Sequence, residues 1–334
     1  MVAAYGQRLV VEDQAAQRHP AFVARRGLRL VCGDRVRWLA GDEENDCAVV
    51  ERLPRDNELT RPDSRGRSEV LAANITQLVV VCAAQPEPDP YIIDRYLAAA
   101  EVMDVAAAVV CNKVDLPQGV PAGLLEEFAG LGYPVLRVSA AAGAGLEGLR
   151  ACLADHRSML VGQSGVGKSS LLNALVPDVE LATAGISSAT GEGRHRTTAT
   201  TLHPLPGGGE LLDSPGVRDF APALDDPRLA AIGFREIVAA ADHCRFANCR
   251  HMREPGCAVK AGVESGAIAP RRYESYRRLL RLTEDLQRRA WIFWRPAKAC
   301  ESVPLSTYSS SPPTGTPCAM RVAPMPRRAQ SSAM

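Results

Sequence analysis

The stretch from Gly162 to Ser170 constrains the fold of this chain more than any other part of the sequence. It contains a glycine, four further residues and then Gly-Lys-Ser, preceded by a short apolar run and followed by a helix-like run. Glycines let successive backbone N–H groups point into one concavity, where phosphate oxygens bind at the positive end of the next helix. Lys168 is placed to reach the β- and γ-phosphates, and the Ser169 hydroxyl to ligate Mg²⁺.

The whole loop is therefore expected to bind a nucleoside triphosphate. Its expected contact residues are Gly162, Gln163, Ser164, Gly165, Val166, Gly167, Lys168, Ser169 and Ser170. An accidental match in a Gly/Ser-rich loop is the alternative, and the strand before and the helix after argue against it.

Apolar runs and helical patterns alternate around this loop. Strands are expected at 75–82, 105–111, 133–138, 158–161 and 210–212, with helices at 90–103, 123–129 and 146–155. Past residue 220 the strands stop, and helices are expected at 222–241 and from about 271 to 290. Continuous apolar strands separated by helices are typical of a doubly wound α/β sheet that is covered on both faces. The fold class predicted for the centre of the chain is thus an α/β P-loop domain.

The first 69 residues have a different pattern of apolar and polar residues. Five short apolar or alternating runs, punctuated by glycines, predict a small β-barrel of the OB type, with strands at 8–11, 21–24, 28–32, 35–39 and 47–51. Such barrels often bind single-stranded nucleic acid, but acids and arginines nearly balance here. RNA binding and a purely structural barrel both remain open. The stretch Leu53–Arg67 is expected to be a loop or linker.

A second motif, Asn112-Lys113-Val114-Asp115, directly follows a predicted buried strand. The Asp115 carboxylate can accept hydrogen bonds from guanine N1–H and its exocyclic amine, which adenine does not offer in that arrangement. Asn112 and Lys113 are expected to brace the loop and cover the base. The pair Ser139-Ala140 ends the next predicted strand, where a backbone N–H can reach the guanine carbonyl.

The residues expected around the γ-phosphate come later in the chain. Asp213 would hold Mg²⁺ through water, and the Gly216 N–H would meet the γ-phosphate. Thr197 and Thr198 are equal candidates to complete the Mg²⁺ shell. Val217 stands where many GTPases place a water-orienting Gln, so intrinsic turnover should be slow.

A catalytic role is open at one further position. His195 is the candidate to position the attacking water, and contact with RNA or protein is the alternative reading of this residue.

Cys244, Cys249, His251 and Cys257 form a dense cluster. Three thiolates and one imidazole suit tetrahedral Zn²⁺ and leave no position for water, so one structural Zn²⁺ is expected. Around and after this cluster the chain is rich in arginine, with Phe246, Tyr273 and Tyr276 interleaved, a composition that suits RNA. A solvated helix face is the alternative for residues 271–289. From about residue 296 a Ser/Pro/Thr-rich tail is expected to be disordered.

The division expected from these patterns is an OB-like barrel at 1–69, a GTPase domain at 70–222, a zinc-binding helical domain at 223–295 and a tail at 296–334. The formal net charge is only +1, so any basic surface must be local. No apolar run reaches the roughly 20 residues of a membrane span, and no signal core is evident. A monomeric cytoplasmic protein without membrane contact is expected.

Together, the motifs resemble those of regulatory GTPases in an unusual order, because the base-recognition motif precedes the phosphate loop. A circular permutation keeps the same sheet while moving the chain ends. With a barrel before it and the spacing Cys-x₄-Cys-x-His-x₅-Cys after it, the chain from about Arg8 to Arg289 resembles the bacterial small-ribosomal-subunit-dependent GTPase A family (RsgA type).

The resemblance implies GTP hydrolysis to GDP, Mg²⁺ with the nucleotide, and stimulation by the small ribosomal subunit during its late maturation. It also implies that the barrel and the zinc domain contact ribosomal RNA. The chain departs from the family at Arg196, which stands where the switch loop usually has its first threonine. An RNA-binding module with a vestigial nucleotide domain is the alternative, and a P-loop kinase or ATPase is disfavoured by Asp115.

Overall fold

The structure is a computed structural model that describes residues 1–5, 8–41, 46–62, 68–176, 200–213, 224 and 226–294. Its strands are β1 (Ala3–Tyr5), β2 (Arg8–Glu12), β3 (Arg18–Val23), β4 (Val36–Leu39), β5 (Cys47–Arg52), β6 (Glu58–Pro62), β7 (Ser68–Ala73), β8 (Gln77–Ala83), β9 (Ala106–Asn112), β10 (Val135–Arg137), β11 (Arg157–Val161), β12 (Thr201–Pro204) and β13 (Glu210–Asp213).

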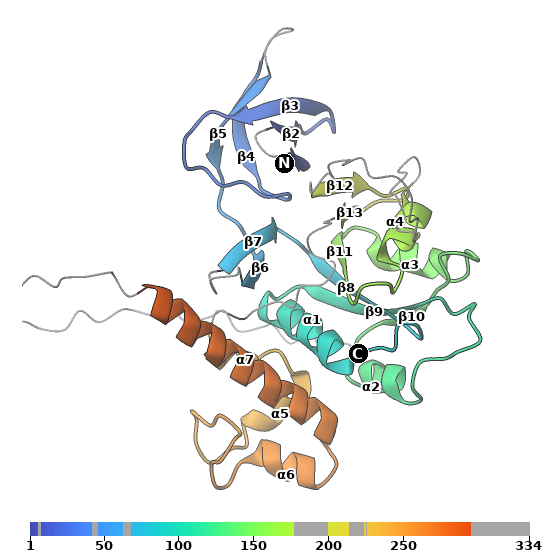
Figure 1. Cartoon of the computed structure of the whole chain (residues 1–334), viewed down its shortest axis with the longest axis vertical. Helices are drawn as coiled ribbons and strands as arrows, with labels where there is room; N and C mark the ends of the chain where they lie inside the picture. Colours follow the sequence, from blue (N-terminus) through green and yellow to red (C-terminus); the bar gives the residue numbers. More distant parts are fainter. Residues whose placement is uncertain are drawn as a thin grey trace, which may run out of the picture. The chain divides into compact units, whose positions relative to one another are not determined.

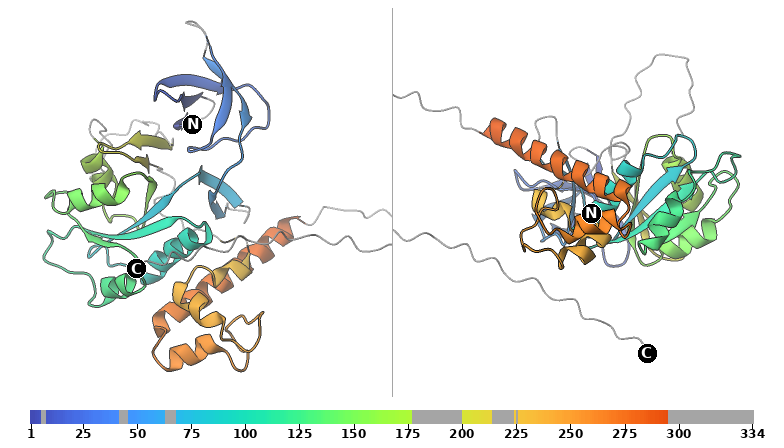
Figure 2. Two further views of the ribbon diagram at one scale, coloured as in Figure 1. Left: turned by 180° about the vertical axis from the view of Figure 1, so that it is seen from behind. Right: turned by 90° about the horizontal axis from the view of Figure 1, so that it is seen from below.

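The helices of the same part of the chain are α1 (Pro90–Val102), α2 (Leu124–Gly130), α3 (Leu146–Leu153), α4 (Lys168–Leu175), the 3₁₀ helix η2 (Pro227–Ala230), α5 (Arg235–Ala241), α6 (Ala258–Glu264) and α7 (Pro270–Trp294). Figure 2 shows α7 as one long helix in both views. None of the helices in these described ranges combines the length and apolar character that a membrane span requires.

The central sheet has the order β10-β9-β8-β11-β13-β12, and only β12 runs antiparallel to its neighbour β13 (Figure 1). All seven residues of β8 are buried, and they alternate between two cores. Val80 belongs to the core that contains α1 and α2, and Val81 to the core that contains α3 and α4. The sheet is therefore covered on both faces, which confirms the predicted doubly wound α/β fold.

The N-terminal strands continue the same sheet in the order β1-β2-β3-β5-β4, with β3 and β5 parallel. That crossed order is typical of the OB-type fold predicted from the sequence. The N-terminal and central parts of this sheet join through β1 and β12, where Ala3 faces Thr201 and the Leu202 N–H donates to the Val2 carbonyl at 2.8 Å. Strand β12 itself was not predicted.

The strand predicted at 28–32 is wrong, because these residues form turns and irregular backbone. They lead into a buried ion pair between Asp34 and Arg55. The Asp34 carboxylate accepts the Val31 N–H at 2.8 Å and two N–H groups of Arg55 at 2.6 and 2.8 Å. Gly33 has φ +94° and sits so close to Ala73 that a Cβ there would lie 2.0 Å from the Ala73 carbonyl oxygen.

The loop predicted at 53–67 is also partly wrong, because β6 lies within it and pairs with β7. Leu59 is buried, and Arg61 is paired with Glu69 across the two strands at 2.8 Å. The predicted domain boundary at 69 falls inside β7. The division of the chain into domains stays a prediction.

Towards the C-terminus, the helix expected from Pro222 to Ala241 is interrupted. Only η2 and α5 are helical among its described residues, and Gly233 between them packs against α1. A Cβ at Gly233 would lie 2.5 Å from the Ala98 side chain. This close approach explains why the chain turns there instead of continuing as one helix. Helix α6 was not predicted.

Candidate functional site

The phosphate-binding loop connects β11 to α4. Gly162 has φ +136°, and a Cβ there would lie 2.1 Å from the Val81 carbonyl oxygen of the neighbouring strand, so only glycine fits. Val166 points into the core under the sheet, whereas Ser164, Gly165 and Ser170 are exposed and Gln163, Gly167, Lys168 and Ser169 are half-buried. The Lys168 ammonium donates to the carbonyls of Gly162 and Gln163, each at 2.6 Å.

Asn112 joins the base-recognition motif to this loop. Its amide donates to the Val166 carbonyl at 2.9 Å, and its side-chain oxygen accepts the Ala140 N–H at 3.2 Å. The side chain is only 2% exposed. Three motifs that lie far apart in the sequence thus meet at the carboxyl ends of parallel strands, where ligands bind in folds of this kind.

The neighbouring residues complete the base side of the site. The Lys113 ammonium donates to the Gly165 carbonyl at 2.6 Å and to the Gln85 carbonyl at 2.9 Å. Asp115 accepts a hydrogen bond from the Ser139 hydroxyl, which is fully buried. Val114 is exposed. The Asp115 carboxylate is therefore held in place by the loop that follows β10.

Gly167 gives a sharp test of this junction. A Cβ there would lie 2.4 Å from the Asn112 amide nitrogen, so Gly167→Ala should displace that amide from the Val166 carbonyl. Leaving a buried carbonyl unpaired costs about 1–3 kcal/mol, so we expect roughly 10- to 100-fold weaker GTP binding. Equilibrium titration with a fluorescent GTP analogue measures the effect.

Gly123 is the matched control. Like Gly167, Gly123 lies immediately before the first residue of a helix and has a positive φ, +81° compared with +94° for Gly167. Unlike at Gly167, a Cβ at Gly123 would meet no atom within 4 Å. Both alanine variants carry the same kind of backbone strain. Equal losses of GTP affinity in the two variants would contradict the proposed role of Asn112.

The γ-phosphate side is described only in part. Asp213 ends β13, which runs parallel to β11, so it lies at the same edge of the sheet as the phosphate-binding loop. His195, Thr197, Thr198, Gly216 and Val217 lie outside the described residues. Their roles remain predictions.

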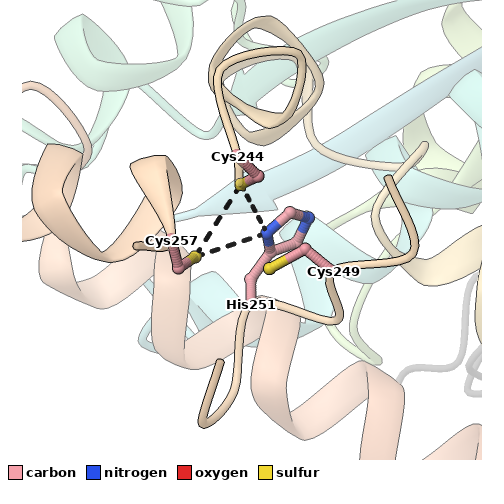
Figure 3. Close-up of side chains that lie close together, drawn as sticks. All are labelled: Cys244, Cys249, His251 and Cys257. Carbon is pink, nitrogen blue, oxygen red and sulfur yellow. Dashed lines mark hydrogen bonds between the residues drawn. The ribbon is translucent and has the colours of Figure 1, made fainter. Parts of the chain in front are cut away.

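The four residues of the Cys/His cluster point toward one another (Figure 3). Their ligand atoms all lie within 4.8 Å of each other. His251 Nδ1 is 3.6 Å from Cys244 Sγ and 3.5 Å from Cys257 Sγ, and these two sulfurs are 4.0 Å apart. Tetrahedral zinc with ordinary Zn–S and Zn–N bonds would give edges of about 3.6–3.8 Å. The donor set and its spacing therefore fit a metal ion.

Burial acts on the ionisation of the His251 and Cys249 side chains in opposite directions with respect to metal binding. Burial lowers the pKa of His251, which favours the neutral imidazole that a metal accepts. Burial and the adjacent thiols of Cys257 and Cys244 raise the pKa of Cys249 to about 12. A divalent cation is the kind of charge that would hold these sulfurs together as thiolates.

Three residues outside the four-residue cluster support the metal loop: Glu254, for which the sequence predicts no role, and Tyr273 and Tyr276, which the sequence suggested for RNA contact. The Glu254 carboxylate accepts the N–H groups of residues 250, 252 and 253 at 2.9–3.1 Å. Burial opposes ionisation, but these backbone hydrogen bonds outweigh it and lower the pKa of Glu254 to about 2. Tyr273 and Tyr276 of α7 donate their hydroxyls to the carbonyls of His251 and Arg250, at 2.5 and 2.6 Å. The spacing of these residues in the sequence does not predict these contacts.

Fewer side chains of the arginine-rich C-terminal region are free to contact RNA than its composition predicts. Arg272 is 1% exposed and Tyr276 2% exposed, so counting them among RNA-contacting residues is wrong. Arg271 is also engaged, with Asp94 and Glu127. Basic and aromatic side chains that remain exposed include Arg245, Phe246, Arg253, Arg281 and Arg289, whereas the exposed Arg250, Arg278 and Arg288 are paired with acids.

These elements define the class of protein. The strand that ends at Asn112, three residues before Asp115, precedes the strand of the phosphate-binding loop in the chain, yet both lie in one sheet with helices on both faces. The chain is a circularly permuted P-loop GTPase, preceded by an OB-type sheet and followed by helices that carry a Cys/His cluster.

Comparison with known proteins gives the family. The RsgA GTPase family matches residues 52–222. A small ribosomal subunit biogenesis GTPase RsgA of Azotobacter vinelandii is 48% identical over 257 residues, which cover 75% of this chain and 74% of the relative. One from Pseudomonas aeruginosa (strain LESB58) is 43% identical over 288 residues, which cover 84% of each. The chain belongs to the RsgA GTPase family and is a GTP hydrolase.

Solved structures agree with this assignment. The crystal structure of YjeQ from Thermotoga maritima matches with a TM-score of 0.67 and 31% identity, over 85% of this chain and 96% of that one. YloQ, described as a circularly permuted GTPase, matches with a TM-score of 0.67 and 26% identity, over 85% and 94%.

Proposed function

We propose that this GTPase binds the small ribosomal subunit and assists its late maturation, hydrolysing GTP to GDP and phosphate faster when the subunit is bound. The observation that carries the proposal is the 48% identity, over three quarters of the chain, to a relative named as a small ribosomal subunit biogenesis GTPase. By this proposal the protein acts in the cytoplasm, as a monomer, where subunits mature.

In the nucleotide site, each residue has a defined task. Lys168 would neutralise the β- and γ-phosphates, and Ser169, Asp213 and one switch threonine would hold Mg²⁺, which would supply positive charge against that of the transferred phosphoryl group. Asp115 selects guanine. Asn112 keeps the base loop and the phosphate-binding loop in register through its contacts with Val166 and Ala140.

In the C-terminal region, the metal we propose is one structural Zn²⁺ held by Cys244, Cys249, His251 and Cys257, whose spacing supports four-coordinate binding. The loop that it orders carries exposed Arg245 beside Phe246, with the guanidinium carbon 5.5 Å from the ring centre. A cation beside an exposed ring suits phosphate and base contacts in RNA. Together with the OB-type sheet, this loop is our proposed contact with ribosomal RNA.

The test is GTP turnover titrated with purified small and large ribosomal subunits. We expect small subunits alone to raise the rate roughly tenfold or more, as when a partner completes a GTPase site. The stimulation should weaken steeply with salt because phosphate contacts release counterions. No stimulation by small subunits, or equal stimulation by large ones, would support the alternative of an RNA-binding module with a vestigial nucleotide domain.

His195 is our candidate for positioning the attacking water, because Val217 cannot do so. We expect His195→Ala to lower subunit-stimulated turnover by about 10²-fold, the usual lower range for a positioned acid–base group, with GTP affinity little changed. Single-turnover hydrolysis with saturating small subunits separates the chemical step from binding. His156→Ala, at a half-buried histidine outside the site, is the control. Wild-type turnover in His195→Ala would remove the residue from the mechanism.

A further inference from the structure

The segment Ala84–Asp89, between β8 and α1, is fastened to the phosphate-binding loop by two side chains. Gln163 of that loop accepts the Asp89 N–H at 3.0 Å and donates to the Glu87 carbonyl at 3.4 Å. Lys113 bridges the Gln85 and Gly165 carbonyls from the base side. Neither of the two Gln163 side-chain contacts has a part in the proposed GTP hydrolysis.

Asp89 is also the residue that caps α1. Its carboxylate accepts the Tyr91 N–H at 2.9 Å, while its own N–H is the group that Gln163 accepts. A cap fixes the position and direction of the first helical turn. The phosphate-binding loop therefore holds the start of α1 directly.

The second turn of α1 is anchored to the C-terminal helices. Asp94 is fully buried, and its two carboxylate oxygens form ion pairs with the guanidinium groups of Arg271 and Arg272 of α7, each at 2.6 Å. Arg272 also pairs with Glu236 of α5 at 2.7 Å. A buried, fully paired cluster of charges resists gradual deformation, because any unpaired charge would be strongly destabilising. A shift of α1 would therefore be passed to α7.

The phosphate end of this connection would have to rearrange when GTP binds. The Lys168 ammonium directs two of its three donors at the Gly162 and Gln163 carbonyls. Binding the β- and γ-phosphates takes two donors, so at least one carbonyl contact must be shared or released when GTP is loaded. The backbone of Gln163 is thus sensitive to the occupant of the site, while its side chain holds α1.

We propose that Gln163 is a positioning residue that latches the phosphate-binding loop to the N-terminus of α1, so that nucleotide loading is transmitted through α1 to α7. This inference rests on GTP binding by the loop and not on the identity of the ribosomal partner. It assigns α1 as the mechanical link between the nucleotide site and the helices that carry the metal cluster.

The test is hydrogen–deuterium exchange of the full chain at saturating GDP and at a saturating non-hydrolysable GTP analogue. In the wild-type protein we expect the two nucleotides to give different protection at residues 86–98 and 268–283. Gln163→Met keeps the side-chain volume but removes both hydrogen bonds. Because both nucleotides are saturating, a change in affinity does not enter the comparison, and we expect the variant to abolish the nucleotide-dependent difference at 268–283.

Two further variants sharpen the result. Gln163→Glu still accepts the Asp89 N–H and should restore part of the difference at 268–283. Gln14→Met, at an exposed glutamine before β3, should behave as wild type. An unchanged difference in Gln163→Met, or no difference in the wild-type protein, would overturn the inference. A failure of small subunits to stimulate turnover would instead contradict the proposed function and leave this result unaffected.

Discussion

We expect Asp115→Asn to weaken GTP binding by about 10²- to 10⁴-fold, because it removes two hydrogen bonds to a charged group, each worth about 1.5–3 kcal/mol. The amide of Asn would face the exocyclic amine of guanine with a donor. Xanthine carries a carbonyl at that position, so XTP should bind the variant better than GTP does. Competition titrations with GTP, XTP and ATP measure the change.

The Asp115→Asn variant should change base recognition without disturbing the surrounding loop. Asp115 is held by the Ser139 hydroxyl, and an amide oxygen accepts the same hydrogen bond, so the loop geometry should be retained. Asp46→Asn, at an exposed position before β5, is the control for a simple change of charge. An unaltered preference for GTP over XTP in Asp115→Asn would show that this carboxylate does not read the base.

The second large effect concerns the metal cluster. We expect wild-type protein to carry one equivalent of Zn²⁺ and Cys257→Ser to lose it on dialysis against a chelator. Structural zinc contributes about 10–16 kcal/mol of apparent binding free energy in zinc-finger peptides, and this loop has few other apolar contacts to replace it. Elemental analysis gives the stoichiometry, and limited proteolysis reports whether residues 242–257 become accessible.

Cys152→Ser is the matched control, since Cys152 is a half-buried cysteine outside the cluster. It should keep one equivalent of zinc and wild-type resistance to protease. Full zinc occupancy in Cys257→Ser, after the same dialysis, would mean that the four side chains meet for a different reason.

Much of the site could be predicted because its chemistry needs particular residues at short spacing. A phosphate-binding loop requires glycines at fixed positions, and Gly162 and Gly167 are indeed placed where a Cβ would collide. Cys244, Cys249, His251 and Cys257 lie within 14 residues, so one local loop can bring them together. The central strands were recognisable from continuous apolar runs, because both faces of β8 are buried.

Features that depend on distant partners could not be predicted. Arg272 reads as one more basic residue of a helix, but its partner Asp94 lies 178 residues earlier. Leu28–Cys32 has the apolar pattern of a strand, but its backbone is irregular and leads to Asp34, whose carboxylate accepts hydrogen bonds from the Val31 N–H and from Arg55. Strand β12 is short and owes its place to neighbours on both sides, β13 and β1.

The junction between β1 and β12 limits how this chain can be divided. Removing the N-terminal strands would leave β12 without its neighbour β1. It would also remove the Arg18 guanidinium, which donates to the Leu202 carbonyl at 3.1 Å. A bare edge strand is a template for pairing with other chains. A shortened GTPase domain would therefore tend to self-associate, and the OB-type sheet serves as the protective border of the nucleotide-binding sheet.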